Sequence, residues 1–259
     1  MDLGIAGKHA IVCASSRGLG RGCAFALAEA GCDVVLNGRD HASLEATGDE
    51  IRERHGVTVK LVPGDVSKAE VQAKLLAACP DVDILINNNG GPPRRDFREI
   101  DREAMIDGLI QNMATPIELI RAVIDGMAGR GFGRIVNITS SSVLAPVPGL
   151  DLSSGARAGL TAFLAGVSRQ VANRNVTVNN LLPGKFDTDR LASGHRARAA
   201  STGDDIDVVI AREIAAIPAK RFGTADEFGR ICAFLCSVHA GYVTGQNFLV
   251  DGGLFPAAF

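Results

Sequence analysis

Two glycines that follow the first predicted strand are the residues whose spacing best suits chemistry. The segment CASSRGLGRG (13–22) places Gly18 and Gly20 where a helix is expected to begin. Without side chains they let an anion approach the backbone, and the free N–H groups and dipole of a helix N-terminus attract it. A tight strand-to-helix turn uses the same residues, but the position within a β-α-β unit favours a ligand site. The segment predicts dinucleotide binding by Ala14, Ser16, Arg17, Gly18, Leu19 and Gly20.

The end of the second predicted strand indicates which dinucleotide is bound. In VVLNGRD (34–40) the chain reaches the place where a nicotinamide dinucleotide presents its 2′ position. An acidic residue there would suit the free ribose of NAD, but Gly38 and Arg39 occupy it. Arg39 and Arg17 offer planar donors that match a 2′-phosphate, unless both are merely solvated. We therefore predict NADP(H) as the preferred cofactor, with NAD(H) as the alternative.

Short β-branched runs alternate with segments of helical periodicity, and together they predict the elements that position these residues. The runs are KHAIVCA, CDVVLN, VTVKLV, VDILIN, GRIVNI, NVTVNNLL and NFLV. This alternation predicts an α/β fold of the Rossmann type, a doubly wound, mainly seven-stranded parallel sheet with helices on both faces. The 259 residues fit one domain, 1–259. Residues 185–220 interrupt the rhythm with a polar, arginine-rich loop that leads into a helix, and we expect a mobile substrate lid there.

Composition excludes several other classes of protein. The net charge is −2 and the basic residues are scattered, which argues against nucleic acid and favours a small-molecule ligand. The N-terminal segment has no signal-peptide pattern, and no apolar run approaches the roughly 18 residues of a membrane span. We therefore expect a cytoplasmic protein without membrane contact. The six cysteines and five histidines have no metal-ligand spacing, so we expect reduced thiols in the core and no metal site.

Six motifs occur along the chain in a characteristic order: SSRGLG, GDV (64–66), NNNG (87–90), GRIVNITS, LPG and YVTGQNFLVDGG. In this order they resemble the short-chain dehydrogenase/reductase family, especially its β-ketoacyl-carrier-protein-reductase-like branch, over nearly the whole chain. The resemblance implies hydride transfer between a nicotinamide and a small carbonyl or alcohol substrate, in a homotetramer or homodimer. It also implies further cofactor-binding residues, namely Asp65, Val66, Asn88, Asn89, Gly90, Arg157, Pro183, Gly184, Phe186 and Thr188.

The active-site tetrad of the family, an asparagine, a serine, a tyrosine and a lysine, is only half present. Asn112 and Ser140 match the first two members. At the family's usual spacing after Ser140, Ser153 stands in place of the tyrosine and Arg157 in place of the lysine. The flanking ARAGLTAF has the form that follows the family's lysine, so a shift of the alignment does not restore the tyrosine. The only tyrosine of the chain, Tyr242, belongs to the YVTGQ segment.

These replacements preserve the shape of the site and change its proton chemistry. Ser153 and Arg157 are one turn apart on one helical face, so both line the expected pocket. A serine hydroxyl is a far weaker acid than a phenol, whose pKa is about 10. Arginine, with a pKa of about 12.5 or more, binds anions but does not readily pass a proton.

Ala14, in place of a family glycine, is expected to be strained if its φ is positive.

Three functions remain open from the sequence. The first is an NADP(H)-dependent oxidoreductase with a non-standard proton donor, either ordered water or one of Asp151, Asp187, Lys185 and His195. The second is a cofactor-binding but catalytically silent sensor or structural subunit. The third is a different reaction in which Arg157 binds a substrate carboxylate or phosphate. The expected substrate walls are Leu144, Pro146, Pro148, the loop at 90–97 and the lid at 191–198, and they include Arg94, Arg95, Arg196 and Arg198.

Overall fold

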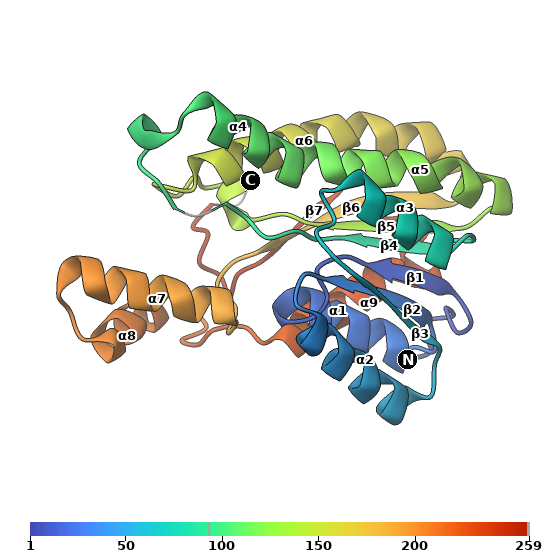
Figure 1. Ribbon diagram of the computed structural model, residues 1–259, viewed down its shortest axis with the longest axis horizontal. Coiled ribbons are helices and arrows are strands. Elements are labelled where there is room, and N and C mark those ends of the chain that lie inside the picture. The colour runs from blue at the N-terminus through green and yellow to red at the C-terminus, as the bar shows by residue number, and fades with distance from the viewer. Residues whose placement is uncertain (93, 258–259) are drawn as a thin grey trace.

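A computed structural model describes residues 1–92 and 94–257 of the chain. Pro93 in the expected substrate loop and residues 258–259 of the expected domain lie outside the described residues. The described strands form one sheet in which all neighbours are parallel, in the order β3-β2-β1-β4-β5-β6-β7 (Figure 1). The strands are β1 (His9–Val12), β2 (Asp33–Gly38), β3 (Val59–Pro63), β4 (Ile84–Asn87), β5 (Gly133–Ile138), β6 (Val176–Pro183) and β7 (Asn247–Val250). The predicted α/β fold class is confirmed.

Helices cover both faces of this sheet (Figure 1). One layer consists of α1 (Gly18–Glu29), α2 (His41–His55) and α9 (Ala225–Cys236). The other consists of α3 (Ala69–Ala78), α5 (Thr115–Arg130) and α6 (Asp151–Val171), with α4 (Arg102–Leu109) leading through a π-helical turn (Ile110–Ala114) into α5. Side chains of β1 alternate between two apolar cores, because Ala10 and Val12 pack with the first layer and Ile11 with the second.

The strand order reverses direction between β1 and β4, and this reversal positions the candidate site. β1 has β2 on one side and β4 on the other, so the connections leave the sheet in opposite directions. A crevice forms at such a point outside the carboxyl ends of the strands. The glycine turn, Arg39, the NNNG segment and Ser140 follow β1, β2, β4 and β5 respectively, so the fold brings them to one edge.

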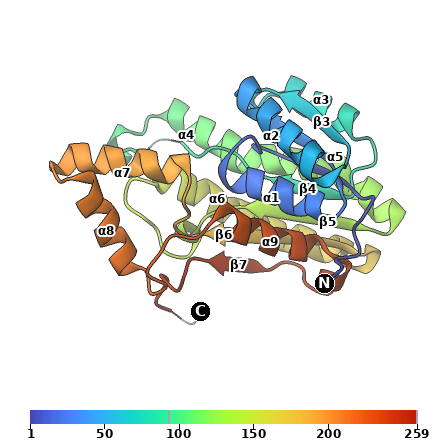
Figure 2. The same cartoon turned by 90° about the horizontal axis from the view of Figure 1, so that it is seen from below.

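Residues 189–216 form two helices, α7 (Asp189–Thr202) and α8 (Ile206–Ala216), which stand away from the body of the molecule (Figures 1 and 2). The prediction of a loop leading into one helix was therefore wrong for the first half of this segment. Thr188 caps α7 by accepting a hydrogen bond from the amide of Leu191, and Gly203 ends it with a φ of +73°. The sequence pattern missed α7 because its polar and small residues give it almost no apolar face. None of the described helices is long and apolar enough to cross a membrane.

Candidate active site

The turn between β1 and α1 leaves backbone N–H groups available to an anion. α1 begins at Gly18, whose φ of +57° lies in the left-handed region. A Cβ atom at Gly20 would lie 2.3 Å from the carbonyl oxygen of Ala14, so no side chain fits there. Arg17 precedes the helix without capping it through its side chain, and residues 18–21 contain no acid. The first-turn N–H groups, which have no partner within a helix, can therefore bind a diphosphate.

Ala14 has the left-handed conformation that glycine favours. Its φ is +46°, which is the strained case considered from the sequence. The amide of Ala14 donates to Oδ1 of Asn37 at 3.3 Å, and its carbonyl oxygen accepts from Nδ2 of Asn88 at 3.1 Å. A left-handed conformation costs an L-residue roughly 1–2 kcal/mol. The hydrogen bonds to the neighbouring strands hold the turn in place against this cost.

Two exposed arginines lie at the carboxyl ends of the adjacent strands β1 and β2. The Nη2 atom of Arg39 is 3.6 Å from the position that a Cβ would take at Gly90. Arg17 donates to Oγ of Ser43 through Nε at 3.1 Å and Nη2 at 2.7 Å. Its Nη1 lies 3.7 Å from a carboxylate oxygen of Asp189, which ties the glycine turn to the start of α7. Arg17 therefore lies at the glycine turn and Arg39 lies beside Gly90, while their contact with a ribose 2′-phosphate stays a prediction.

Asp65 and Val66 follow β3 beside these arginines. Oδ1 of Asp65 accepts from the amide of Ser67 at 2.9 Å and from its hydroxyl at 2.8 Å. Burial acts to raise the pKa of Asp65, but these hydrogen bonds and the charge of Arg39 outweigh it and hold the pKa below its usual range. Val66 is buried against the pocket described below. Asp65 is therefore a carboxylate at neutral pH and an acceptor for a nucleotide base or ribose.

The NNNG segment joins the glycine turn to the π-helical turn. Asn88 bonds to Ala14, as described, and Nδ2 of Asn89 donates to the carbonyl oxygen of Gln111 in the π-helical turn at 3.2 Å. Oδ1 of Asn89 accepts from the amide of Gly90 at 2.8 Å. Asn89 replaces the alanine of the commoner family motif, and its amide adds two contacts that alanine lacks. Hydrogen bonds to the glycine turn on one side and to the π-helical turn on the other therefore hold the NNNG segment.

Ser153 and Arg157 form a hydrogen-bonded pair on α6. Nε of Arg157 donates to Oγ of Ser153 at 3.2 Å, and Nη1 donates to the carbonyl oxygen of Ile138 at the end of β5 at 2.6 Å. Both side chains are buried. Ser140, two residues after Ile138, accepts through Oγ from the amide and hydroxyl of Ser142. The structure thus brings Ser153 and Arg157 to the carboxyl end of β5, two residues before Ser140.

Arg157 is a buried cation whose partners are neutral oxygens. Its third contact is a long hydrogen bond from Nη2 to the carbonyl oxygen of Asn89, at 3.4 Å. Burial, and to a smaller extent the positive charge of Arg190, lower the pKa of Arg157 to about 10. The guanidinium therefore stays charged at neutral pH, where it binds and orients but does not release a proton.

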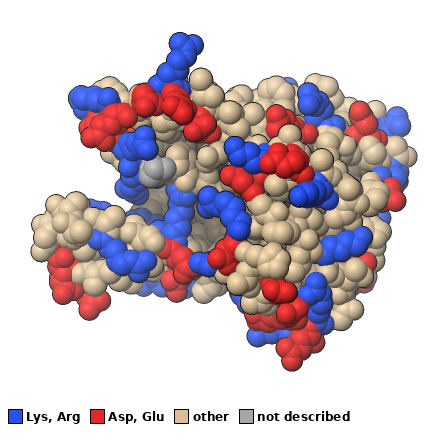
Figure 3. All heavy atoms as spheres, in the orientation of Figure 1, with Lys and Arg blue, Asp and Glu red and all other residues tan. Residues whose placement is uncertain are grey.

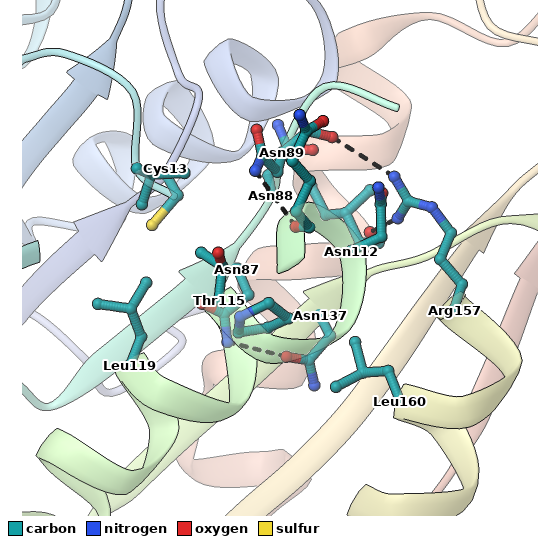
Figure 4. Close-up of a pocket in the computed structure, with 14 residues that line it drawn as sticks. Cys13, Asn87, Asn88, Asn89, Asn112, Thr115, Leu119, Asn137, Arg157 and Leu160 are labelled. Atoms are coloured by element: carbon teal, nitrogen blue, oxygen red, sulfur yellow. Dashed lines mark hydrogen bonds between the residues drawn. The ribbon is translucent and has the colours of Figure 1, made fainter. Parts of the chain in front are cut away.

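A pocket lies between the NNNG segment, the π-helical turn and α6 (Figure 4). Figure 4 shows Arg157 extending from α6 toward Asn89 and Asn112. Nδ2 of Asn112 donates to the carbonyl oxygen of Gly108, and its Oδ1 has no partner among the described residues. Oδ1 of Asn87 and Oγ1 of Thr115 line the same pocket and are equally unpaired within the described chain. Three buried oxygens without partners indicate ordered water, because buried polar groups are nearly always hydrogen-bonded.

Two residues of the segment after β6 differ in their surroundings: Thr188 lies beside the glycine turn, and Phe186 lies in the core. A Cβ at Gly18 would lie 3.5 Å from the methyl group of Thr188, so Thr188 adjoins the expected diphosphate site. Phe186 is buried, and its ring packs edge-on against Phe228 with centroids 5.2 Å apart. Only the main chain of Phe186 is therefore free to face a cofactor. Pro183 and Gly184 lead into this segment, and Gly184 has no room for a Cβ because Asp251 would lie 2.5 Å from it.

Glu213 of α8 is a charged residue that the sequence analysis missed. Its carboxylate lies 2.7 Å from Nζ of Lys185, 3.0 Å from Nε2 of His195 and 3.4 Å from Nη1 of Arg198. Burial acts to raise the pKa of Glu213, but hydrogen bonds from Lys185 and His195 lower it below its usual range. No local spacing reveals such a cluster, because its members come from separate segments. Lys185 and His195, considered as proton donors, are thus occupied with Glu213.

The remaining candidate residues are exposed or bonded within the loops. Asp187 is exposed, and Oδ2 of Asp151 accepts from the amide of Gly149 at 3.2 Å. Tyr242 is fully exposed and precedes β7, at the opposite end of the sheet from Ser140. Arg196 is bonded to Ser193 on its own helix. None of these residues therefore supplies an acid comparable to a phenol beside Ser140.

The parallel sheet, its crevice and the glycine turn together define a Rossmann-type α/β protein. The chain belongs to the short-chain dehydrogenase/reductase family. A family model described as enoyl-(acyl carrier protein) reductase matches residues 13–255. This result confirms the resemblance noted in the sequence.

Relatives of known name and structure align with almost the whole chain. The 3-oxoacyl-[acyl-carrier-protein] reductase of Escherichia coli is 32% identical, with 96% of this chain and 98% of that protein aligned. The NADPH-dependent reductase BacG of Bacillus subtilis is also 32% identical, over 95% of this chain and 97% of the relative. A crystal structure of L-sorbose reductase from Gluconobacter frateurii, complexed with NADPH and L-sorbose, superposes with a TM-score of 0.94 at 27% identity, covering 99% of this chain and 100% of that one.

Proposed function

We propose that the protein is an NADP(H)-dependent oxidoreductase that acts on a small carbonyl or alcohol substrate. The observation that carries this proposal is the glycine turn at the switch point of the sheet. Its amides at residues 18–20 have no hydrogen-bond partner among the described residues, and its Gly20 leaves no room for a side chain. Relatives named as an NADPH-dependent reductase and solved with NADPH support it. A bound nicotinamide supplies or accepts the hydride in such a reaction.

In this proposal, different residues of the crevice bind different parts of the cofactor. The glycine turn binds the diphosphate, while Arg39 and Arg17 bind the 2′-phosphate. Asp65 and Val66 meet the adenine, and the stretch 88–90 runs beside the adenosine ribose. Arg157 donates to the nicotinamide ribose, since its three observed bonds leave two of its five N–H groups free. Residues 183–188 pass the nicotinamide.

The two serines bind the substrate oxygen in the proposed mechanism. Ser153 accepts a hydrogen bond from Arg157, so its own hydroxyl hydrogen is free to be donated to a carbonyl oxygen. Ser140 provides the second hydroxyl. Neither serine is acidic enough to be the proton source, and a neutral water molecule is no stronger an acid. The proton therefore comes from bulk solvent, and water held by the unpaired oxygens of Asn87, Asn112 and Thr115 relays it toward the substrate oxygen.

Slow turnover is the expected consequence. General acid catalysis contributes about 10²–10⁴-fold, whereas orientation of the reactants contributes about 7–11 kcal/mol. The oriented hydroxyls of Ser140 and Ser153 preserve the contribution of orientation, which is the larger of the two. Loss of the phenol therefore reduces the rate without abolishing it.

The projection formed by α7 and α8 serves as the substrate lid within 185–220 in this proposal. Its contacts with the body include Arg190, whose Nη1 donates to the carbonyl oxygen of Gly91 at 3.1 Å, and the pairing of Asp189 with Arg17. Few contacts of this kind must break for the helices to move. Hydrogen exchange of α7 and α8 should slow when NADPH and a substrate bind.

A catalytically silent, cofactor-binding protein is the second candidate. It is favoured by one observation: the buried ionisable groups that line the pocket are Arg157 and Cys13, and neither is a proton donor at neutral pH, since burial raises the pKa of Cys13 to about 12. The two candidates are separated by measuring NADPH oxidation over a panel of aldehydes and ketones at saturating cofactor. Oxidation with any carbonyl supports the reductase. Tight NADPH binding with no oxidation supports the silent protein.

The proposed reductase is a cytoplasmic homotetramer or homodimer. The six cysteines are buried and free, which fits a reducing compartment. Large apolar side chains are exposed along α4 and the π-helical turn, and such a surface fits contact with a second copy. They are Met105, Ile106, Leu109 and Ile110. Light scattering of the purified protein gives the number of subunits.

A further inference from the structure

A hollow separates the α7–α8 projection from the body, and basic side chains line it (Figure 3). Arg190 reaches into this region from α7 and bonds to Gly91 on the opposite wall. A Cβ at Gly91 would lie 2.6 Å from Nη2 of Arg190, so the guanidinium rests directly on the glycine. Arg190 therefore spans the gap between the lid and the loop that follows β4.

Among the described residues of the lid, Arg190 and Arg196 lack an acidic partner, and of these two only Arg190 bonds to the opposite wall, whereas Arg196 bonds to Ser193 on its own helix. Arg198 lies 3.4 Å from Glu213, and Arg212 lies 2.6 Å from Asp204. Among residues 1–92 and 94–257, no carboxylate lies within 4.0 Å of Arg190. Partial burial lowers the pKa of Arg190, and the positive charge of Arg94 lowers it further. Neither Arg190 nor Arg94 forms a salt bridge within residues 1–92 and 94–257, so no acid in contact with either arginine offsets its charge.

Arg157 lies near Arg190, because Nη2 of Arg157 donates to the carbonyl oxygen of Asn89 and Nη1 of Arg190 donates to that of Gly91, two residues further along the same loop. It is buried, its pKa is lowered by burial and then by Arg190, and its partners are neutral oxygens. Holding the buried cation of Arg157 near a second cation costs free energy that a bound anion would offset. Guanidinium groups are also the side chains best matched to a carboxylate, through paired N–H donors. The arrangement therefore suits the binding of an anion.

We propose that Arg190, with Arg94 and Arg157, binds the carboxylate of an oxo-acid substrate. This inference rests on the proposed function and specifies its substrate class. The diphosphate of the cofactor is a second source of negative charge. The substrate is favoured because Arg157, the innermost member, is bonded to Ser153 at the proposed carbonyl position, whereas the diphosphate has the free amides of α1.

Binding of oxo acids and of their uncharged esters tests this site without requiring turnover. Pyruvate, acetoacetate and 4-oxopentanoate, each beside its methyl ester, are titrated by calorimetry into the protein alone and into its NADP⁺ complex. The three acids differ in the separation of carbonyl and carboxylate. At least one acid should bind about tenfold or more tightly than its ester, since a charge-assisted pair contributes about 1.5–3 kcal/mol. Equal binding of each acid and ester, or no binding of any acid, overturns the proposal.

Variants of Arg190 identify the residue and distinguish the two sources of charge. Arg190→Gln should weaken acid binding about tenfold and leave the Kd of NADPH unchanged, and Arg190→Lys should lose less. Arg212→Gln removes the same charge from the same pair of helices at an exposed position and should change neither constant. A loss of NADPH affinity in Arg190→Gln with unchanged acid binding assigns the arginine to the cofactor and overturns the proposal.

Failure of the proposed function gives a different result from failure of this inference. If acids bind in an Arg190-dependent manner but NADPH is not oxidised with any carbonyl, the carboxylate site stands and the reductase activity does not. If neutral ketones are reduced as well as the acids, the reductase stands and the carboxylate site is contradicted. Unchanged thermal melting of Arg190→Gln and Arg190→Lys confirms that the variants are folded.

Discussion

Nε of Arg157 donates a hydrogen bond to Oγ of Ser153 at 3.2 Å, one helical turn earlier on α6. From the sequence, we predict that the pair occupies the two positions at which most members of the family carry a tyrosine and a lysine. The arginine keeps a cation against the end of β5, through Ile138, and the serine keeps a hydroxyl. The site therefore retains its hydrogen-bonding groups while losing a phenolic acid.

Restoring the usual pair should accelerate turnover. Ser153→Tyr combined with Arg157→Lys introduces a phenol whose proton can be donated and a lysine that supports it. We expect kcat to rise by about 10²–10⁴-fold, the usual contribution of a general acid. The measurement is NADPH oxidation with whichever carbonyl the unaltered protein reduces best. A double variant that is folded, binds NADPH and shows no increase contradicts the account of the missing acid.

Arg39 should determine the preference for NADP(H). Arg39→Gln removes a guanidinium that can bind a 2′-phosphate, so NADPH should bind about 10- to 100-fold more weakly, from the 1.5–3 kcal/mol of a charged hydrogen bond. NADH lacks that phosphate, and its Kd should stay the same. Arg54→Gln, an exposed arginine on α2 that pairs with Glu50, is the matched control. Equal weakening of both dinucleotides in Arg39→Gln would assign the residue to general stability.

Ala14→Gly should stabilise the fold. The φ of +46° costs alanine roughly 1–2 kcal/mol, and glycine adopts it freely but loses about 0.5–1 kcal/mol through its larger unfolded-state entropy. The free energy of unfolding in urea should therefore rise by about 0.5–1 kcal/mol. Ala172→Gly, at an exposed residue with φ of −57°, should instead lower it or leave it unchanged. A loss of stability in Ala14→Gly would show that Ala14 is unstrained.

Glu213 should hold α8 in place in a pH-dependent manner. Its pKa is lowered in the folded protein, so its stabilising contribution is present above its unfolded pKa and is lost as the pH falls through the lower, folded pKa. Measured relative to the intrinsic exchange rate, which itself falls in acid, hydrogen exchange in α7 and α8 should accelerate in acid before that of α1 does. Glu213→Gln should produce the same acceleration at neutral pH, with a loss of about 1–3 kcal/mol. Uniform acceleration throughout the chain would contradict this local role.

The sequence predicted the sheet and the edge that carries the site, because both depend on local patterns. β-branched runs mark all seven strands, and Gly18 and Gly20 mark the turn after β1. The pairing of Ser153 with Arg157 also follows from helical spacing.

Contacts between distant segments could not be predicted in this way. Glu213 meets Lys185 and His195 only after α7 and α8 fold against each other. Arg190 reaches Gly91 across the hollow, a contact between residues 99 positions apart. α7 itself was missed because its stability comes from caps at its ends rather than from an apolar face.

Titration with NADPH and NADH tests the central claim most directly. The chain has no tryptophan, so the fluorescence of the reduced nicotinamide can be followed without a tryptophan background. A binding site that uses the α1 amides and Arg39 should bind both dinucleotides, and NADPH about tenfold or more tightly than NADH. Failure of the folded protein to bind either dinucleotide would contradict both the reductase and the silent cofactor-binding protein.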